Sequence, residues 1–460
     1  MLSKENLEEI VRTSLRNGGD LAEVFIEETR ASTVSCEDNK IEKISSGIEA
    51  GAGIRVICGK ETAYIATSQV SFEGLREAAL KISEPLCGDK AKKKIELKPQ
   101  LDAAAAERIQ KRPEAVHVDQ KAEKVMLLDR TARSFGQKVR QVTVRYADSN
   151  QAVTIANSEG VYVEDNRIRS RYFINVIAHQ GGVLQTGYEA PGGTLGFEIF
   201  DLYPPEEHAR RAAERALRML DAPHAPAGKM TVVLSSEAGG TLIHEACGHA
   251  LEADFIMKGT SIFAGKVGKK VASDLVTVID DGTSPGKFGT LAFDDEGTPA
   301  QRTVLIENGV LKGFMSDRFT ARELGIPASG NGRRQDFRHK PVPRMTNTLI
   351  APGRTAPEEI VASVGSGLLV KRMGGGQVNV TNGDFVFEAT EAYLIENGKI
   401  KHPVRGAILT GNGPRILETI DMVGSDLGWQ TGVCGKYDHA PVADAQPTLR
   451  IPEIVIGGKI

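Results

Sequence analysis

The sequence predicts an α+β fold in two domains. Residues 1–222 alternate helix-like stretches with strand-like runs, whereas residues 223–460 are mainly strand-like and rich in Gly and Asn turns. A proline-rich break, APHAPAG at residues 222–228, separates the two halves. We therefore expect an N-terminal α/β domain of short strands and helices over residues 1–222. A mainly β C-terminal domain that carries one buried helix follows over residues 223–460.

The first domain combines amphipathic helices with short strands. An opening helix carries Leu7, Ile10, Val11 and Leu15 on one face, and a second helix follows Ser71. Short β-like runs lie between these helices. The other elements predicted here are a polar, solvated connection over residues 88–113, a long helix from about residue 119 to 135, strands between residues 138 and 180, and a helix over residues 205–220.

The second domain is mainly β. The segments VLIENGVLKGF and YLIENGKIKHP each contain an Asn-Gly pair, which favours a type I′ hairpin turn. The apolar run MTVVLS predicts a buried strand, Ser236 is a suitable N-cap, and a helix continues to Leu251. Apolar residues cover more than one face of this helix, so we expect it to be buried. The glycine-rich GSGLLVKRMGGGQV predicts turns and close backbone approach, because it lacks the spacing of a phosphate-binding loop.

Composition excludes several classes of protein. Lysine plus arginine (57) nearly balance aspartate plus glutamate (60), which gives a net charge of −3 and argues against direct nucleic-acid binding. There is no long uncharged apolar run and no apolar leader, so neither a membrane span nor secretion is predicted. Five scattered cysteines have no framework spacing and are expected to be reduced. We expect a cytoplasmic protein.

The predicted buried helix contains HEACGHALEAD, residues 244–254, with the pattern H-E-x-x-x-H. It is one residue longer than the zinc-peptidase signature H-E-x-x-H. In a regular helix, residues five apart diverge by about 140° and rise by about 7.5 Å, so His244 and His249 would point to different places. A π-type turn near Cys247 and Gly248, with about 4.4 residues per turn, would return the two side chains to within about 50° of each other.

A metal site is one of two interpretations of these residues. A single histidine on an apolar helix is more often a hydrogen-bonded core residue than a ligand. His244, Glu245 and His249 occur together in a segment whose other side chains are mostly apolar. Because unpaired buried charges are costly, this combination makes a metal site about as well supported as hydrogen-bonded core residues. Catalytic zinc usually takes three protein ligands. Cys434, in the glycine-flanked GVCGK, is the preferred third ligand; His439 is a weaker candidate, and Cys247 is expected to be a core residue.

These motifs resemble the TldD branch of the TldD/PmbA family. The resemblance covers nearly the whole chain, is strongest after Thr231, and rests on HEACGHALEAD, RMTNT (residues 344–348), GGGQVNVTNGDFVFEATEAYLIENG (374–398), TGNGP (410–414) and the GVCGK loop. Members are named modulators of DNA gyrase and are understood as zinc-dependent peptidases. H-E-x-x-x-H separates TldD from its paralogue PmbA, also called TldE. After the family's Cys-Gly-Lys this sequence continues with Tyr-Asp-His, so the loop tip is less well matched.

The resemblance implies roles for four residues. His244, His249 and Cys434 would be the Zn2+ ligands, and Glu245 would be the base. It also implies a dimer, either a heterodimer with a PmbA/TldE-type paralogue or a homodimer, whose active site faces an enclosed cavity that admits unfolded peptide. We expect the dimer to form through the larger β-rich portion.

The function expected from the sequence is zinc-dependent hydrolysis of unfolded or small peptides, with Glu245 activating the water. Glu252 and Asp254 are candidates to orient the histidine rings, although exposed helix-end charges explain them equally well. The basic run GNGRRQDFRHKPVPRMTNT, residues 330–348, is expected to be a surface loop, with a role in holding a peptide as the alternative. The rival function is a non-catalytic binding or assembly protein, a gyrase modulator or precursor-peptide binder, whose metal is structural.

Overall fold

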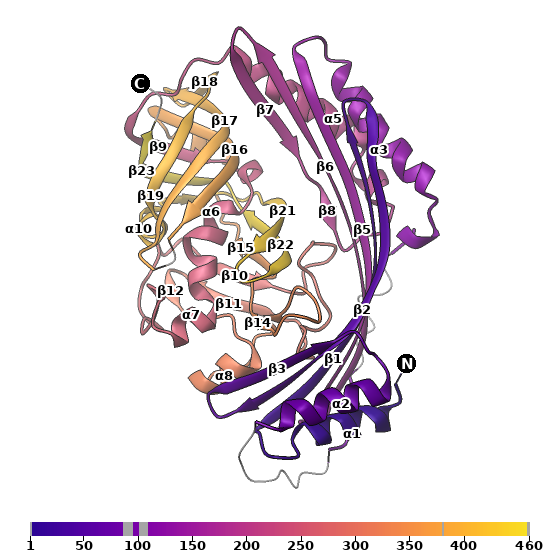
Figure 1. Ribbon diagram of the computed structural model, residues 1–460. Coiled ribbons are helices and arrows are strands. Elements are labelled where there is room, and N and C mark those ends of the chain that lie inside the picture. Colours follow the sequence, from indigo (N-terminus) through magenta and orange to yellow (C-terminus); the bar gives the residue numbers. More distant parts are fainter. Residues whose placement is uncertain (1, 86–94, 101–108, 380, 458–460) are drawn as a thin grey trace.

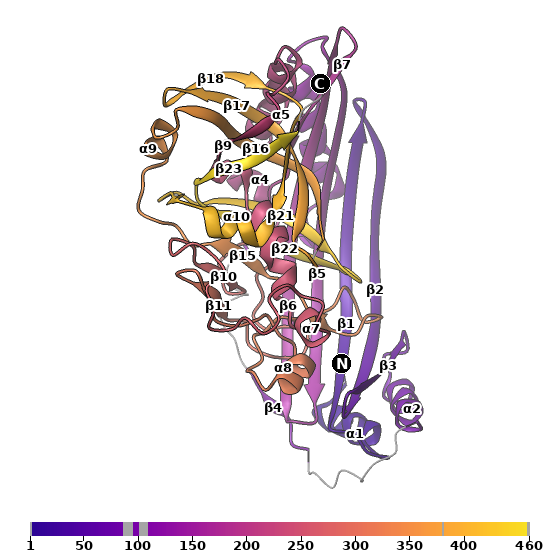
Figure 2. The same cartoon turned by 90° about the vertical axis from the view of Figure 1, so that its left-hand side faces the viewer.

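The computed structural model describes residues 2–85, 95–100, 109–379 and 381–457. Helices and strands occur in both halves, and the C-terminal half contains less helix than the N-terminal half, which confirms the predicted α+β class. Figure 1 shows a long twisted sheet from the N-terminal half that runs along the whole molecule, with the C-terminal strands packed against one side of it. Figure 2, a view from the side, shows the same two layers. Most of the connection predicted over residues 88–113 lies outside the described residues.

The N-terminal sheet has the strand order β3-β2-β1-β5-β6-β4, and β7 and β8 also pair with β6. The main ladders are antiparallel. Its strands are β1 (Leu21–Glu37), β2 (Lys40–Cys58), β3 (Glu61–Thr67), β4 (Lys98–Pro99), β5 (Val139–Asn157), β6 (Val161–Gln180), β7 (Val183–Glu189) and β8 (Gly192–Gly193). The helices are α1 (Lys4–Ser14), α2 (Phe72–Ser83), α3 (Val118–Arg133), α4 (Ile199–Leu202) and α5 (Pro205–Leu220), with a 3₁₀ turn at Pro113–Ala115.

The prediction of short strands in this domain was wrong. Strands β1, β2, β5 and β6 have 17, 19, 19 and 20 residues. One β-strand serves two cores: Ala22 and Val24 of β1 pack with α1 and α2, whereas Val34 and Cys36 pack with α3 and α5. Between its apolar ends the strand continues through polar sequence because backbone pairing with β2 and β5 is unbroken there.

The C-terminal half contains two larger sheets and short helices. Its strands are β9 (Gly228–Leu234), β10 (Val278–Asp281), β11 (Arg302–Glu307), β12 (Val310–Leu311), β13 (Gly332–Arg333), β14 (Val342–Pro343), β15 (Asn347–Ile350), β16 (Ser366–Val378), β17 (Asp384–Glu396), β18 (Lys399–Val404), β19 (Ala407–Asn412), β20 (Met422–Val423), β21 (Gly428–Gly435), β22 (His439–Gln446) and β23 (Leu449–Gly457). Its helices are α6 (Thr241–Ile243), α7 (Ala253–Met257), α8 (Arg318–Leu324), α9 (Pro357–Ala362) and α10 (Gly413–Thr419).

One C-terminal sheet closes into a barrel, and the other extends beside it. Strands β16-β9-β23-β19-β17 form a ring because β16 also pairs with β17. The second sheet has the order β12-β11-β10-β15-β22-β21. Both Asn-Gly hairpins occur as predicted: Asn308 and Gly309 have φ of 46° and 79°, and Asn397 and Gly398 have φ of 50° and 71°.

The two halves meet through an apolar cluster and buried ion pairs. Phe25 of β1 and Val163 of β6 pack with Phe293 and Phe337 of the C-terminal half. Beside them, Arg55 of β2 pairs with Glu23 at 2.8 Å and also with Glu296, and all three side chains are fully buried. These contacts fix how the long sheet lies against the C-terminal half.

The division into two domains between residues 222 and 223 stays a prediction, because buried contacts join the two halves of the chain closely.

Among the described residues, no helix is both long enough and apolar enough to cross a membrane.

Candidate metal centre

The helix that carries H-E-x-x-x-H changes its winding at the motif. It begins as α6, continues as a π turn over His244–Gly248 and ends as a 3₁₀ turn over His249–Leu251. The backbone N–H of His249 donates to the carbonyl of His244, five residues back. A side chain at Gly248 would collide with the sulfur of Met345, 2.3 Å from a Cβ built there. The predicted π turn is therefore confirmed, and glycine at its end leaves room for the Met345 side chain.

The helix begins later than predicted. Ser236 lies in a separate 3₁₀ turn that is capped by Ser235, and α6 starts after Gly240. Gly239 has a φ of 69°, which breaks the continuity between the 3₁₀ turn and α6.

The π turn brings both histidines to one sulfur. His244 Nε2 lies 3.2 Å from Cys434 Sγ, and His249 Nε2 lies 3.3 Å from the same atom. The two imidazole rings are 4.9 Å apart between centroids and nearly perpendicular. All three side chains are buried, and their candidate ligand atoms lie within 4.8 Å of one another. The three ligands predicted from the sequence thus come together, although they are up to 190 residues apart along the chain.

Each imidazole is oriented by a buried carboxylate. His244 donates from Nδ1 to Asp444 Oδ1 at 2.7 Å, and His249 donates from Nδ1 to Glu252 Oε2 at 3.2 Å. The prediction for Glu252 is consistent with this geometry, and its exposed alternative is wrong because Glu252 is fully buried. Asp254 does not contact a histidine; its carboxylate accepts from Lys436 at 2.6 Å. Asp444 was not found from the sequence, because only the pairing of β22 brings it near the motif.

Cys434 lies at the end of strand β21 rather than in a loop, and buried cations hold its hairpin. Arg344 donates to the carbonyl of Cys434 at 2.7 Å and pairs with Asp438. Lys436 lies 3.0 Å from Glu252, the carboxylate that orients His249. The hairpin is therefore tied directly to the partner of the second histidine.

The prediction that residues 330–348 form a surface loop was wrong. Arg333, Arg334 and Arg344 have exposed fractions of 3%, 5% and 0%. Arg334 donates to Glu23 of β1, and Arg333 donates to the carbonyl of Pro441. Charged residues are rarely buried unless they are paired, and these pairs come from distant segments that local sequence does not reveal.

The donor atoms are arranged as a metal site requires. Because both Nδ1 atoms donate to carboxylates, a neutral imidazole keeps its lone pair on Nε2, and both lone pairs face Cys434. When the rings are instead protonated on Nε2, they donate to Cys434 and carry positive charge; although burial raises the pKa of the Cys434 thiol, these effects outweigh it and lower the pKa to about 6. A buried thiolate needs positive charge beside it, which protons on the two rings supply without a metal and which a metal ion would supply when bound by both Nε2 lone pairs. Two nitrogens and one sulfur are ligands typical of zinc, and three protein ligands leave one position free.

Glu245 follows His244 in the π turn and lines a cavity. The sequence suggested a buried glutamate, but Glu245 is only half-buried and lines a cavity of about 940 Å³ between the two halves of the chain. No hydrogen bond or ion pair of its carboxylate occurs within the described residues. It is therefore free to act on a molecule in the cavity.

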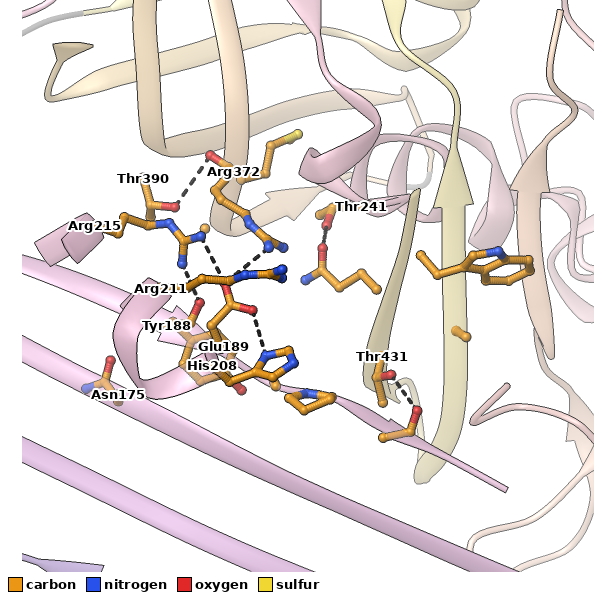
Figure 3. Close-up of a pocket in the computed structure, with 18 of the residues that line it drawn as sticks. Asn175, Tyr188, Glu189, His208, Arg211, Arg215, Thr241, Arg372, Thr390 and Thr431 are labelled. Carbon is orange, nitrogen blue, oxygen red and sulfur yellow. Dashed lines mark hydrogen bonds and ion pairs between the residues drawn. The ribbon is translucent and has the colours of Figure 1, made fainter. Parts of the chain in front are cut away.

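The opposite wall of the cavity is a buried charge network. Figure 3 shows His208, Arg215 and Arg372 around Glu189, with Thr241 and Thr431 on the other side. Glu189 lies 3.1 Å from His208 Nδ1, 2.9 Å from Arg215 and 3.1 Å from Arg372. Burial raises the pKa of Glu189, but these three partners outweigh burial and lower it to about 2. Arg372 belongs to β16 and the others to the N-terminal half, so the network joins the two walls.

The glycine-rich segment forms strand β16, so the prediction of turns there was wrong. Close backbone approach is confirmed, since a Cβ at Gly376 would lie 1.9 Å from the Phe387 side chain. The ladder with β17 shifts register between Val370 and Gly376, which keeps the strand irregular. Residues 374–376 line the cavity and expose their backbone to it.

Two other candidates lie outside the cluster. Cys247 is buried among apolar residues, its thiol 3.6 Å from the carbonyl of Ile243, and burial raises its pKa. It is the core residue that the sequence predicted. His439 is exposed and contacts Gln335 at 3.1 Å, so the weaker ligand candidate is wrong.

Three family models match the chain in succession: PmbA/TldA metallopeptidase domain 1 over residues 22–84, the central domain over residues 111–220 and the C-terminal domain over residues 227–458. A protein of Haemophilus influenzae named "Metalloprotease TldD homolog" is 37% identical over 474 residues, which cover 99% of this chain and 97% of that protein.

Solved structures share the fold. A crystal structure from Thermotoga maritima MSB8, described as a candidate modulator of a DNA gyrase, superimposes with a TM-score of 0.80 at 24% identity and covers 99% of this chain and 100% of that chain. TldE from Thermococcus kodakarensis superimposes with a TM-score of 0.76 at 23% identity and covers 98% and 100%.

We expect Asp444→Asn to weaken Zn2+ binding roughly 10- to 100-fold, because the neutral amide no longer supports the charge and orientation of His244. Competition with a chelator of known affinity measures the change. Asp421→Asn is the matched control, since Asp421 forms only an exposed ion pair with Arg450. Equal Zn2+ affinity of Asp444→Asn and the wild type would show that Asp444 does not support a ligand.

Proposed function

This chain belongs to the PmbA/TldA metallopeptidase family. From its buried His-His-Cys cluster we propose that it is a zinc-dependent peptidase of the H-E-x-x-x-H type, which hydrolyses unfolded or small peptides. His244, His249 and Cys434 would hold one Zn2+. The observation that carries the proposal is the convergence of both Nε2 atoms on Cys434 Sγ beside a glutamate that faces a cavity.

When bound, zinc would supply a Lewis acid that polarises a peptide carbonyl and lowers the pKa of a water molecule. Glu245 would accept a proton from that water and pass it to the leaving amine. Its position supports this role, since it follows His244 directly and reaches the cavity. Asp444 and Glu252 keep the imidazole lone pairs directed at the cluster.

The cavity fits an extended substrate better than a compact one. A second cavity of about 1060 Å³ adjoins the first and shares with it Thr186, Gly375, Gly376 and Thr390. Together they form a groove that β7 lines on one side and β16 and β17 line on the other. Such a groove is larger than most small-molecule sites, which supports a peptide substrate.

A structural metal is less well supported. A closed structural zinc site has four protein ligands. Within the described residues, three candidate ligands come together, and the neighbouring acid, Glu245, is turned to the cavity. This arrangement favours a catalytic site over the non-catalytic binding or assembly protein that the sequence left as the alternative.

We expect Glu245→Gln to keep one Zn2+ per chain and to lose most peptide hydrolysis, at least about 100-fold in kcat, because the amide cannot accept the proton. His244→Ala should lose both the metal and the activity. Metal analysis and cleavage of an unstructured peptide by the same preparations test the two variants together. Hydrolysis that persists in Glu245→Gln, or in the wild type after complete removal of metal, would contradict the mechanism.

We also propose a dimer, either a heterodimer with a PmbA/TldE-type paralogue or a homodimer, formed through the β-rich C-terminal half. Half-exposed Val455 of strand β23 supports this position, whereas Val386 and Ile408 on the neighbouring strands β17 and β19 line the second cavity. The cytoplasmic location stays a prediction.

Light scattering at micromolar concentration should give about twice the mass of one 49.4 kDa chain for the purified protein alone, or for its mixture with the paralogue. Val455→Glu should convert the dimer to a monomer, because burial of an unpaired charge is costly. A mass of one chain in both samples would contradict this proposal.

A further inference from the structure

One cation in the cavity beside Glu245 has no anionic partner among the described residues. Lys287 lines the cavity, and its ammonium lies 4.5 Å from the centroid of the Trp429 ring. Burial lowers the pKa of Lys287, and no carboxylate acts against this effect. The two most buried lysines, Lys121 and Lys436, lie 2.6 Å from Asp148 and Asp254 respectively. Lys287 therefore differs from these two buried and paired lysines.

The other cations of the cavity are already paired. Arg215 and Arg372 share Glu189, as Figure 3 shows, and Arg211 pairs with Glu207. An incoming anion would have to compete with these carboxylates, whereas it meets Lys287 without competition.

The loop that carries Lys287 is held in place. Asp281 accepts from the hydroxyls of Thr283 and Ser284 at 2.6 and 3.0 Å. At its other end, Gly289 N donates to Asn347 Oδ1 at 3.1 Å, and a Cβ at Gly289 would collide with the backbone of Thr346. The base of the lysine side chain is therefore fixed, which reduces the entropy lost when it binds a ligand.

Strand β21 connects this position to the metal cluster. Trp429, Gln430, Thr431 and Val433 of this strand line the cavity, and Cys434, next along the strand, contacts the histidines. Cys434 follows Trp429 by five positions along the strand, about 17 Å at the rise of an extended chain. An extended peptide that reaches both positions would span roughly five residues.

We propose that Lys287 and Trp429 form a subsite for a carboxylate of the bound peptide. Lys287 would supply the charge, and the Trp429 ring would supply an apolar surface for the adjoining part of the chain. The carboxylate is either the peptide's free C-terminus or an Asp or Glu side chain, about five residues from the bond that is cut. The substrate class rests on the proposed peptidase function, but binding of the carboxylate does not require hydrolysis.

Trp429 is the only tryptophan of the chain, so its fluorescence reports directly on this subsite. The Glu245→Gln protein, which keeps the cavity without turnover, is titrated with N-acetylated octapeptides that lack aromatic residues. One pair differs only in a C-terminal acid or amide. A second, amidated pair differs only in one internal Glu or Gln. The two pairs distinguish the two sources of the carboxylate.

We expect a saturable change in fluorescence with roughly tenfold tighter binding of the acid in at least one pair, the size of one charge-assisted contact. In the same background, Lys287→Gln should remove that preference, whereas Lys287→Arg should retain most of it. Lys399→Gln, at an exposed lysine outside the cavity, is the matched control and should retain the preference fully.

Equal affinity for both members of both peptide pairs would overturn the proposal. A preference for the acid that survives in Lys287→Gln would also overturn it, and so would the lack of any peptide binding. If the preference for the acid depends on Lys287 but the wild type cleaves no peptide, the subsite stands and the proposed peptidase function fails. The fluorescence titration thus separates the two failures.

Discussion

The convergence of two imidazoles on one sulfur is the constraint on which the candidate site depends. His244 and His249 are five residues apart, and only a widened turn can direct both at Cys434. The helix meets this constraint by changing its winding, and Gly248 leaves room for the sulfur of Met345, which would have to move if a side chain were present there. Glu245 then lies on the side of the helix that faces the cavity. One irregular turn thus sets the positions of both ligands and of the candidate base.

Burial explains the charged residues around the cluster. Asp444, Glu252, Asp254 and Asp438 are buried near the two histidines, and the described cations that pair with them are the buried Lys436 and Arg344 and the half-exposed Lys258. A thiolate adds to this negative excess, and a divalent metal would offset it. The same cations hold the Cys434 hairpin, so ligand position and charge balance depend on the same contacts.

Local pattern was enough for much of this structure. Amphipathic spacing located α1, α2, α3 and α5, the Asn-Gly pairs located two hairpins, and the odd spacing of the histidines required the π turn. The sequence could not show what depends on distant pairing. Asp444 reaches His244 through the β21–β22 ladder, Arg344 is buried by contacts with the hairpin, and β1 is long because two separate pairs of helices cover it.

X-ray absorption at the zinc edge of the purified, zinc-loaded protein is the most direct measurement. The proposed ligands predict one sulfur at about 2.3 Å together with imidazole nitrogens at about 2.0–2.1 Å. The sulfur should disappear in Cys434→Ser and remain in the matched variant Cys247→Ser. A wild-type spectrum with nitrogen and oxygen ligands only, or a sulfur that persists in Cys434→Ser, would contradict the proposed metal centre.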